Sequence, residues 1–452
     1  MAETAEQKIL QQRLETLTTA LHSGTAGQVR SLLSGLHPAE IADLLESLPH
    51  GPREILWELV DPEDKGEVLT EVNDEVRAGL IEQTADEQLV AITGGLNTDD
   101  LADLLQDLPG AVIHELLHSM DKQDRQRLEA VLSYPEDTAG GLMNLDVVTV
   151  RANVNLDVVL RYLRLRGEIP ELTDSLFVVD RFDRYQGVLP LSTLLTSDPD
   201  ASVAEVMDRE VEGIPATMKD VEVARLFQDR DLVSAPVVDD DNRLLGRITI
   251  DDVVDVIRDE ADHSLMSMAG LDEEDDIFAP VTVSARRRAI WLGVNLATAF
   301  LASWVIGQFE TTLQKVVALA VLMPIVASMG GIAGSQTLTI MIRGLALGQV
   351  GPSNARSLMH KELLVSIMNG IIWSLVVALI AMAWFHDPRI GVVIASALII
   401  NLVCGAVAGL TIPLLLKRLG IDPALAGTVV LTTITDVVGF MAILGLGTWY
   451  LL

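Results

Sequence analysis

The residue best placed to do chemistry is Asp436, an acid inside an apolar run near the C-terminus. A charge within a membrane span costs at least about 2.5 kcal/mol, so we expect it to face a water-filled path or a partner. Helical spacing places small and hydroxyl side chains beside it as a pore-lining stripe. The residues of this stripe are Thr428, Thr432, Thr435 and Gly439.

The oxygen atoms of this stripe suit a hard divalent cation, and Mg²⁺ in particular keeps much of its water and takes one or two carboxylates. The sequence therefore predicts a metal site at Asp436 in a pore. The alternative is a buried acid bonded to a neighbouring helix. One acid per chain is few, which favours a homodimer that brings two copies of Asp436 together.

A second pattern with chemical meaning is His114-Glu115-Leu116-Leu117-His118. Histidines four residues apart on a helix can bind zinc, and the glutamate between them can act as the general base of a protease. Membrane proteases of this kind carry the motif inside a transmembrane helix, whereas here it lies in a polar, acidic half of the chain. We therefore expect an ordinary amphipathic helix and no enzyme, with a zinc-dependent membrane protease as the weaker alternative.

The elements that must position these residues follow from the distribution of charge. The chain has 452 residues, a formal net charge of −32 and 49% hydrophobic residues, with a mean hydropathy of +0.36. Acidic and apolar residues are segregated, because only 5 of the 64 acidic residues lie after residue 285. This pattern excludes a single soluble domain, and the acidic half excludes a nucleic-acid partner bound through its phosphates.

Five apolar runs occupy the C-terminal part of the chain, and each reaches the roughly 20 residues that cross a bilayer as a helix. They are Ala289–Gln308, Val316–Ile342, Leu363–Phe385, Ile390–Leu416 and Ala424–Leu452. The N-terminus lacks the basic and apolar segments of a cleaved signal, so we expect the acidic half to stay in the cytoplasm. The cytoplasmic loops then hold eight basic residues against two outside, which obeys the positive-inside rule. The sequence predicts a multi-pass protein of the cytoplasmic (inner) membrane, in contact with lipid.

Glycines interrupt two of these runs. Gly330 and Gly334 lie four residues apart after Pro324, and Gly405 and Gly409 repeat the spacing in the fourth run. Small residues at this spacing let helices approach closely. The alternative is a helix loosened around Pro324, with backbone carbonyls facing a pathway.

The acidic half contains an internal repeat with an offset of 59 residues. Phe177–Asp180 and Gly187–Leu189 correspond to Pro236–Asp239 and Gly246–Ile248. Each copy predicts a strand, an acidic turn, a second strand and a helix. The duplicated β-α-β-β-α unit resembles a pair of CBS domains. In the second copy the resemblance implies that Thr249 and Asp252 bind a nucleotide, which makes ATP a candidate regulatory ligand; a purely structural pair is the alternative.

Residues 1–135 have the pattern of amphipathic helices. Ile41–Pro49 and Leu101–Pro109 are near copies of each other, 60 residues apart. Short helices separated by prolines predict a small superhelix of helical hairpins.

The order of these parts resembles the MgtE-type magnesium transporters over essentially the whole chain. The matching membrane motifs are Met323–Gln336, Arg343–Ala346, Asp422–Leu425 and Thr435–Val437. The implied architecture is multidomain: an all-α helical superhelix, an α/β CBS pair and a polytopic α-helical membrane domain with five transmembrane helices. The implied limits are 1–135 for the acidic helical domain, 136–200 and 201–258 for the CBS domains, 259–285 for a plug-like connecting helix and linker, and 286–452 for the membrane domain.

The resemblance implies a homodimeric, magnesium-selective and magnesium-gated channel for uptake, in which Asp436 matches the pore ligand. Mg²⁺ ions bound between the cytoplasmic domains and the connecting helix would lock the closed state; acids that merely confer solubility are the alternative. The matching regulatory acids are Glu67, Asp99, Asp103, Glu222, Asp231, Asp252, Asp255 and Glu260.

The chain also departs from the family pattern. His263 and Ser264 replace acids of the connecting helix, and Ile332, Ser335 and Thr428 stand where the family often has asparagine. A broader divalent-cation transporter, passing cobalt for example, is therefore the alternative to magnesium selectivity.

Overall fold

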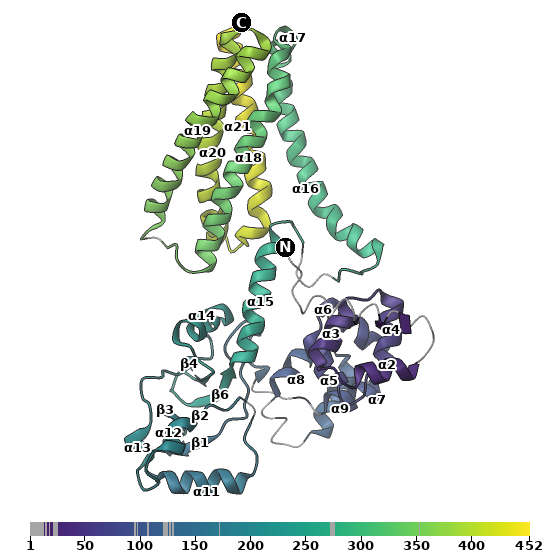
Figure 1. Ribbon diagram of the computed structural model, residues 1–452, viewed down its shortest axis with the longest axis vertical. Helices are drawn as coiled ribbons and strands as arrows, with labels where there is room; N and C mark the ends of the chain where they lie inside the picture. The colour runs from purple at the N-terminus through teal and green to yellow at the C-terminus, as the bar shows by residue number, and fades with distance from the viewer. Residues whose placement is uncertain are drawn as a thin grey trace. The chain divides into compact units, whose positions relative to one another are not determined.

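The computed structural model describes residues 26–94, 98–105, 108–120, 131–170, 172–271, 276–351 and 353–452, and the single positions 13, 16, 17, 19, 20, 96, 125 and 128. The side chains at 98, 99, 103, 115 and 119 lie outside this description. The chain forms two compact units (Figure 1). One contains the described residues up to Asp262 together with 276–279, and the other contains His263–Leu271 and Pro280–Leu452.

The N-terminal part of the first unit consists of short helices. They are α2 (Ala26–Leu33), α3 (Pro38–Glu46), α4 (His50–Leu59), α5 (Lys65–Glu71), α6 (Asp74–Gln83), α7 (Asp86–Thr93), α8 (Thr98–Leu105) and α9 (Gly110–Ser119). The near-copies found in the sequence are α3 and α8, and each ends before a proline, Pro49 or Pro109, that caps the next helix. Leucines such as Leu44 and Leu104 are buried, so one apolar face of each copy builds the core.

Two three-stranded sheets follow. They contain β1 (Thr149–Arg151), β2 (Ser175–Val179) and β3 (Tyr185–Pro190), and β4 (Ile214–Pro215), β5 (Ser234–Val238) and β6 (Leu244–Thr249). In both sheets the first strand runs parallel to the second and the second antiparallel to the third. The accompanying helices are α11 (Leu156–Arg166), α12 (Leu191–Thr196), α13 (Val203–Val206), α14 (Asp220–Arg230) and α15 (Ile250–Ser267). The predicted duplicated unit is confirmed.

The repeated acidic turns explain why the two sheets share a sequence pattern. Asp180 Oδ1 accepts hydrogen bonds from the backbone N–H groups of Phe182 (2.7 Å) and Arg184 (3.0 Å). Asp239 makes the equivalent bonds in the second copy. An aspartate in this position holds a tight turn by hydrogen-bonding its own backbone two residues on. The strands β2–β3 and β5–β6 are therefore joined in the same way.

The helix α15 runs without interruption from Ile250 to Ser267, across the predicted limit at residue 258 between the second CBS domain and the connecting helix. The connecting helix is thus a continuation of the last CBS helix in this structure. The predicted limits of the separate domains remain predictions.

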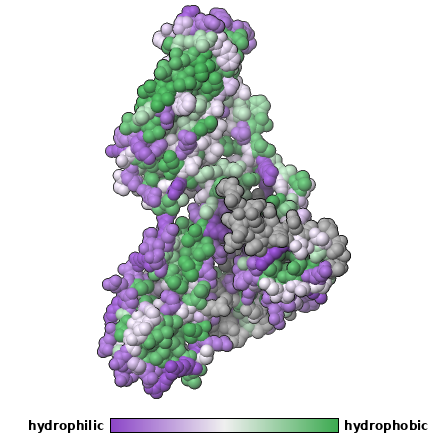
Figure 2. All heavy atoms as spheres, in the orientation of Figure 1, coloured by the Kyte–Doolittle hydropathy of each residue, from purple (hydrophilic) through white to green (hydrophobic). Residues whose placement is uncertain are grey.

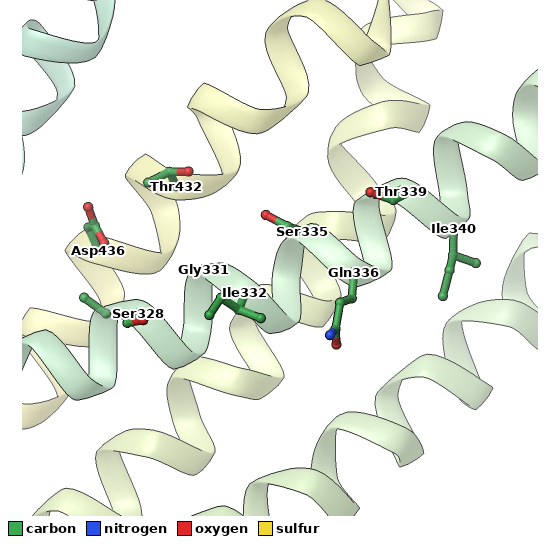
Figure 3. A pocket seen from close by; sticks show the side chains of 10 residues that line it. Ser328, Gly331, Ile332, Ser335, Gln336, Thr339, Ile340, Thr432 and Asp436 are labelled. Atoms are coloured by element: carbon green, nitrogen blue, oxygen red, sulfur yellow. The ribbon is translucent and has the colours of Figure 1, made fainter. Parts of the chain in front are cut away.

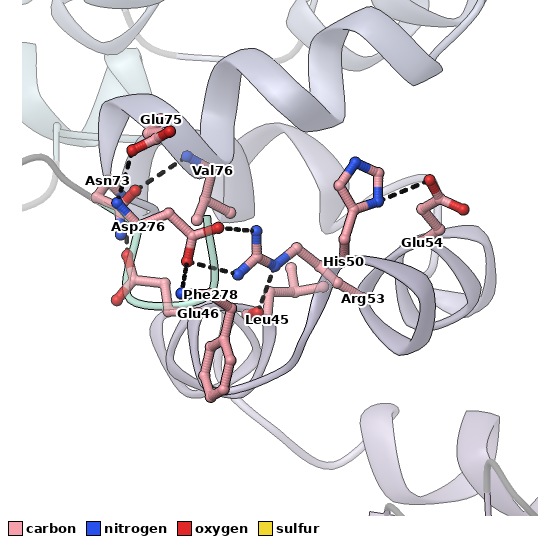
Figure 4. A network of polar contacts seen from close by, with 10 residues as sticks. All are labelled: Leu45, Glu46, His50, Arg53, Glu54, Asn73, Glu75, Val76, Asp276 and Phe278. Atoms are coloured by element: carbon pink, nitrogen blue, oxygen red, sulfur yellow. Dashed lines mark hydrogen bonds and ion pairs between the residues drawn. The ribbon is translucent and has the colours of Figure 1, made fainter. Parts of the chain in front are cut away.

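The segment that follows α15 is fixed to the N-terminal helices by a buried ion pair (Figure 4). Arg53, on α4, donates to both carboxylate oxygens of Asp276 at 2.6 and 2.9 Å, and both side chains are 8% exposed. Burial alone would raise the pKa of Asp276, but the hydrogen bonds from Arg53 and from the Phe278 N–H lower it below its usual range. The Asp276 N–H donates to Glu75, so this carboxylate and its backbone are fully engaged.

Five long helices form the second unit. They are α16 (Val281–Gly307), α18 (Val317–Ala346), α19 (Ala355–Phe385), α20 (Pro388–Arg418) and α21 (Pro423–Leu451), with the short α17 (Glu310–Lys315) after the first. Each long helix has the length and composition of a membrane span, which confirms the five predicted spans. Apolar side chains such as Phe300 on α16 and Leu375 on α19 are more than half exposed, and Figure 2 shows the resulting apolar surface of this unit. A bilayer would cover this surface.

The glycine spacing is explained by close packing of α18 on α20. A Cβ atom on Gly405 would lie 2.8 Å from the Gly330 carbonyl oxygen, and one on Gly409 would lie 2.7 Å from that of Gly334. Both distances are shorter than any real Cβ contact, so only glycine permits this approach.

The alternative of a loosened second span is wrong for this structure. The helix α18 continues through Pro324 and the glycines from Val317 to Ala346. Proline within a transmembrane helix is tolerated when neighbouring groups satisfy the backbone carbonyls that it frees.

Candidate functional site

A groove of about 830 Å³ lies along α18 beside α21 (Figure 3). Its α18 lining is Ala327, Ser328, Gly331, Ile332, Ser335, Gln336, Thr339 and Ile340, and its α21 lining is Thr432 and Asp436. The α18 residues recur at intervals of three and four, so they form one face of that helix. The opposite face carries the glycines that pack on α20.

The groove offers oxygen atoms and one formal charge. Figure 3 shows the side chains of Thr432 and Asp436 on α21, and those of Ser328 and Ser335 on α18. Across the described residues no cationic side chain pairs with Asp436. Hydroxyl, amide and carboxylate oxygens are the ligands that hard divalent cations prefer. The groove can therefore receive a cation whose charge Asp436 would balance.

The predicted stripe on α21 is divided by the structure. Thr432 lines the groove, and its hydroxyl donates to the Thr428 carbonyl oxygen at 2.9 Å. Thr435 is fully buried, and its hydroxyl bonds the carbonyls of Leu431 and Thr432 within its own helix. Gly439 is buried against the amide of Asn401 on α20.

The division of the stripe has a simple cause. Thr435 and Gly439 lie on the side of α21 that packs against neighbouring helices, which a helical wheel drawn without those neighbours cannot reveal. Only part of the predicted stripe therefore lines the groove within one chain, and the pore-lining role of its members stays a prediction.

One chain does not assemble a complete metal site among its described residues. No three His, Cys, Asp or Glu side chains lie together in a metal-binding arrangement within that part of the chain. Asp436 thus supplies a single carboxylate to its groove. This agrees with an ion that keeps most of its water shell.

The predicted regulatory acids are spread over the first unit. Glu67 lies on α5, Glu222 in the first turn of α14, Asp231 at its C-terminal cap, and Asp252, Asp255 and Glu260 on α15. Asp99 and Asp103 lie on α8, where their side chains fall outside the described residues. The proposed regulatory role of these acids therefore rests on the resemblance.

Two acids that the sequence did not single out, Asp43 and Glu71, have raised pKa values in the first unit. Burial raises the pKa of Glu71 on α5, and the charge of Asp255 raises it further. Burial also raises the pKa of Asp43 on α3 and of Asp255, and the nearby Arg258 only partly opposes this. Glu71 of the N-terminal helices and Asp255 of α15 therefore repel each other. The signal in the sequence was the acidic residue within each short amphipathic helix.

The predicted nucleotide-binding residues lie together at the junction of β6 and α15. The Thr249 N–H and hydroxyl both donate to Asp252 Oδ2, at 3.4 and 3.2 Å, and the hydroxyl also contacts Asp251. Thr249 is buried. The arrangement keeps a hydroxyl and a carboxylate side by side, and their nucleotide-binding role stays a prediction.

The end of α15 contacts the start of the helix that carries Asp436. His263 Nε2 lies 3.4 Å from Asp422 Oδ2, and Asp422 caps α21 by accepting from the N–H groups of Ala424 (2.9 Å) and Leu425 (3.1 Å).

The HExxH pattern lies on α9. His114 and His118 are exposed, with ring centroids 5.6 Å apart, and the Glu115 side chain lies outside the described residues. Two exposed histidines on one helix are two of the three or four ligands that a zinc site needs.

Comparisons with known proteins cover nearly the whole chain. Residues 323–446 match the family model of the divalent cation transporter MgtE, residues 36–137 that of the MgtE intracellular N domain, and residues 139–200 and 203–259 that of the CBS domain. The magnesium transporter MgtE of Thermus thermophilus is 32% identical over 432 residues, covering 94% of this chain and 96% of the relative. That of Bacillus subtilis is 28% identical over 431 residues, covering 95% and 96%.

Solved structures are similar in the first unit. The cytosolic domain of the Mg²⁺ channel MgtE in complex with ATP is 35% identical and covers 54% of this chain and 99% of that one, with a TM-score of 0.49. The soluble part of a magnesium transporter is 24% identical and covers 56% and 99%, with a TM-score of 0.47.

Proposed function

This chain belongs to the MgtE family of magnesium transporters, and from that premise we propose that it forms a magnesium-selective channel that cytoplasmic Mg²⁺ closes. It is a Mg²⁺ transporter with several membrane spans and a soluble N-terminal part. The proposal adds that the transporter is selective for Mg²⁺, carries it into the cell, is gated by cytoplasmic Mg²⁺ and lies in the cytoplasmic membrane. The observation that carries it is Asp436, which lines the α18–α21 groove without a cationic partner among the described residues.

The chemistry of the ion path follows from that carboxylate. A hydrated Mg²⁺ entering the groove is attracted by Asp436, and the hydroxyls of Ser328, Ser335 and Thr432 can hydrogen-bond its water shell. A second copy of the chain, related by a twofold axis, would add a second Asp436 and complete a site with two carboxylates. We therefore assign a homodimer with its ion path between the two copies.

The membrane potential alone could drive uptake. Each elementary charge gains about 2.3 kcal/mol per 100 mV of membrane potential, so a divalent cation gains about twice that on entering a negative interior.

The gate is assigned to the first unit and α15. Burial raises the pKa values of Asp43, Glu71 and Asp255, and the charge of Asp255 on α15 raises that of Glu71 further, which supports this assignment. Divalent cations bound there, together with the regulatory acids named above, would offset the repulsion and favour the packed arrangement. The contact of His263 with Asp422 then gives α15 a direct mechanical connection to the helix of Asp436. Mg²⁺ can shift this gate only by binding the closed state more tightly than the open one.

A broader divalent-cation transporter is the second candidate. The serine, threonine and glutamine side chains of the groove offer oxygen ligands but no arrangement specific to one ion.

ATP is assigned as a regulatory ligand at Thr249 and Asp252, where a hydroxyl and a carboxylate lie together.

Uptake of Mg²⁺ into proteoliposomes tests the proposal. Wild type, Asp436→Ala and the control Glu310→Gln, an exposed acid outside the groove, are compared at several Mg²⁺ concentrations on the cytoplasmic side. We expect flux in wild type and control, loss in Asp436→Ala, and closure as cytoplasmic Mg²⁺ rises. Normal flux through Asp436→Ala would overturn the assignment of the pore ligand. Co²⁺ passing as fast as Mg²⁺ would favour the broader transporter.

A further inference from the structure

Asn401 is a fully buried amide in the middle of α20, and it occupies an unusual position between two other helices. Its Nδ2 donates to the carbonyl oxygen of Val326 on α18 at 2.8 Å. A Cβ atom on Gly330 of α18 or on Gly439 of α21 would collide with this same amide group. The carboxamide therefore fills the gap that these two glycines leave open.

The Val326 carbonyl fixes the orientation of the amide. If the group were turned over, Oδ1 would face the Val326 oxygen, and two acceptors in contact repel each other. With Nδ2 on Val326, no described residue donates a hydrogen bond to Oδ1, which is fully buried. A buried amide oxygen without a partner is unfavourable, so an aliphatic side chain would be easier to accommodate here. What the amide provides and an aliphatic side chain cannot is the hydrogen bond to the Val326 carbonyl oxygen.

The ion groove is lined by two of these three helices, α18 and α21. Val326 directly precedes the groove residues Ala327 and Ser328, and Gly439 follows Asp436 by less than one helical turn. Asn401 thus lies behind the groove at the level of Asp436. At this level the Asn401 carboxamide lies between Gly330 of α18 and Gly439 of α21.

From this geometry we propose that Asn401 is a positioning residue for ion selection. Its carboxamide acts as a spacer that sets the separation of Asp436 from the oxygen atoms of α18, and its bond to Val326 fixes the register of α18. Asn401 does not touch the ion; it determines how closely the two walls approach the ion and its water shell. The inference rests on the proposed function, because it assigns a role in selecting the ion that the groove passes.

The test compares Mg²⁺ and Ca²⁺ flux into proteoliposomes of the full-length protein, because a wider groove should first lose its preference for the smaller ion. The variants are Asn401→Ala, Gly439→Ala and the double variant. Ser374→Ala is the control, since Ser374 is a buried hydroxyl on α19 that bonds only its own helix at the Ile371 carbonyl in the described structure. All variants are checked for a monodisperse profile in detergent.

We expect Asn401→Ala to lower the Mg²⁺/Ca²⁺ flux ratio about tenfold, since displacements near 1 Å in a site have effects of that order or larger. Gly439→Ala should lower Mg²⁺ flux about tenfold, because its methyl group meets Nδ2 of Asn401 at 2.7 Å. The double variant should recover Mg²⁺ flux, because the smaller residue at 401 makes room for the methyl group; such coupling is expected only between groups in contact. The control should keep both flux and ratio.

An unchanged flux ratio in Asn401→Ala, or losses that simply add in the double variant, would overturn the role of Asn401. Should Asn401→Ala not purify as a single species, Gly439→Ala decides: unchanged Mg²⁺ flux in that variant would refute the spacer. These outcomes are distinct from failure of the proposed function, which would appear as absent Mg²⁺ flux in wild type and in the Ser374→Ala control.

Discussion

Asp276 in the first unit and Asp436 in the second are both carboxylates in protected surroundings, and their surroundings treat them in opposite ways. Asp276 receives two hydrogen bonds from Arg53 and one from the Phe278 N–H. Asp436 has no ion pair with a described residue, and the nearby amide of Asn401 keeps one oxygen without a donor. A group that holds the fold together has all its bonding capacity engaged, whereas a group beside an ion path keeps some unused.

The largest expected effect is a loss of unfolding free energy when the Arg53–Asp276 ion pair is broken. Arg53→Leu leaves the Asp276 carboxylate buried without its cation, and breaking a buried pair in this way costs about 3–5 kcal/mol. Denaturant unfolding of the full-length protein in detergent measures the loss. Arg161→Leu is the control, because its pair with Asp157 is exposed and such pairs contribute less than about 1 kcal/mol. Equal losses in the two variants would contradict the structural role of Asp276.

The next largest effect is expected where the glycines of α18 and α20 pack together, a contact called here the glycine seam. Gly409→Ala places a methyl group 2.7 Å from the Gly334 carbonyl oxygen, and overpacking of this kind costs about 1–3 kcal/mol. Gly445→Ala is the matched control on α21, since open space surrounds that position. The thermal midpoint of the purified protein should fall for Gly409→Ala and stay unchanged for Gly445→Ala. A fall of similar size in both would show that helix propensity, and not the seam, sets the effect.

Replacing Asp by Asn should change the free energy of unfolding in opposite directions at Asp436 and at Asp276. Asp436→Asn removes an uncompensated charge from a membrane span and should raise the free energy of unfolding by about 1 kcal/mol while abolishing Mg²⁺ flux. Asp276→Asn should lower the free energy of unfolding, because Arg53 then loses its counter-charge. Thermal midpoints in Mg²⁺-free detergent solution give both signs. A destabilised Asp436→Asn variant would mean that this carboxylate also supports the fold.

The smallest effect is expected from the repelling carboxylates of the first unit. Because burial, and then Asp255, raise the pKa of Glu71 in the folded protein, its protonated form favours folding. This contribution is present at acid pH and is lost as the pH rises from the unfolded value of about 4.3 through the folded pKa. In Mg²⁺-free solution at neutral pH, Glu71→Gln should therefore raise the thermal midpoint by about 2 °C. Added Mg²⁺ should shrink the difference, and a Gln variant less stable than wild type at neutral pH would contradict the repulsion.

The elements of this chain could be predicted from the sequence because their signals are local. The acidic turns at Asp180 and Asp239 repeat at a fixed offset, and each apolar run is long enough to be read without knowledge of its neighbours. Asp436 was identifiable because an acid within an apolar run is costly wherever the helix packs. These predictions needed only the spacing and type of residues.

What the sequence left open depends on which elements meet. The helical wheel of α21 placed Thr435 with Asp436, but in the folded protein Thr435 is fully buried, whereas Thr432 is exposed and lines the groove. Asn401 resembles any other polar residue of a span until Gly330 and Gly439 are brought beside it. Arg53 and Asp276 are separated by 223 positions, and no periodicity connects residues so far apart.

The Arg53–Asp276 pair also bears on how the first unit is best produced as a soluble fragment. A fragment that stops at Ser267, the last residue of α15, lacks Asp276. The buried Arg53 guanidinium then keeps its hydrogen bond to the Leu45 carbonyl but has lost its counter-charge. A fragment that extends to Ala279 keeps the pair and the Glu75 hydrogen bond. The longer fragment should express at higher yield and resist proteases better, although the described residues among those added belong to no helix or strand.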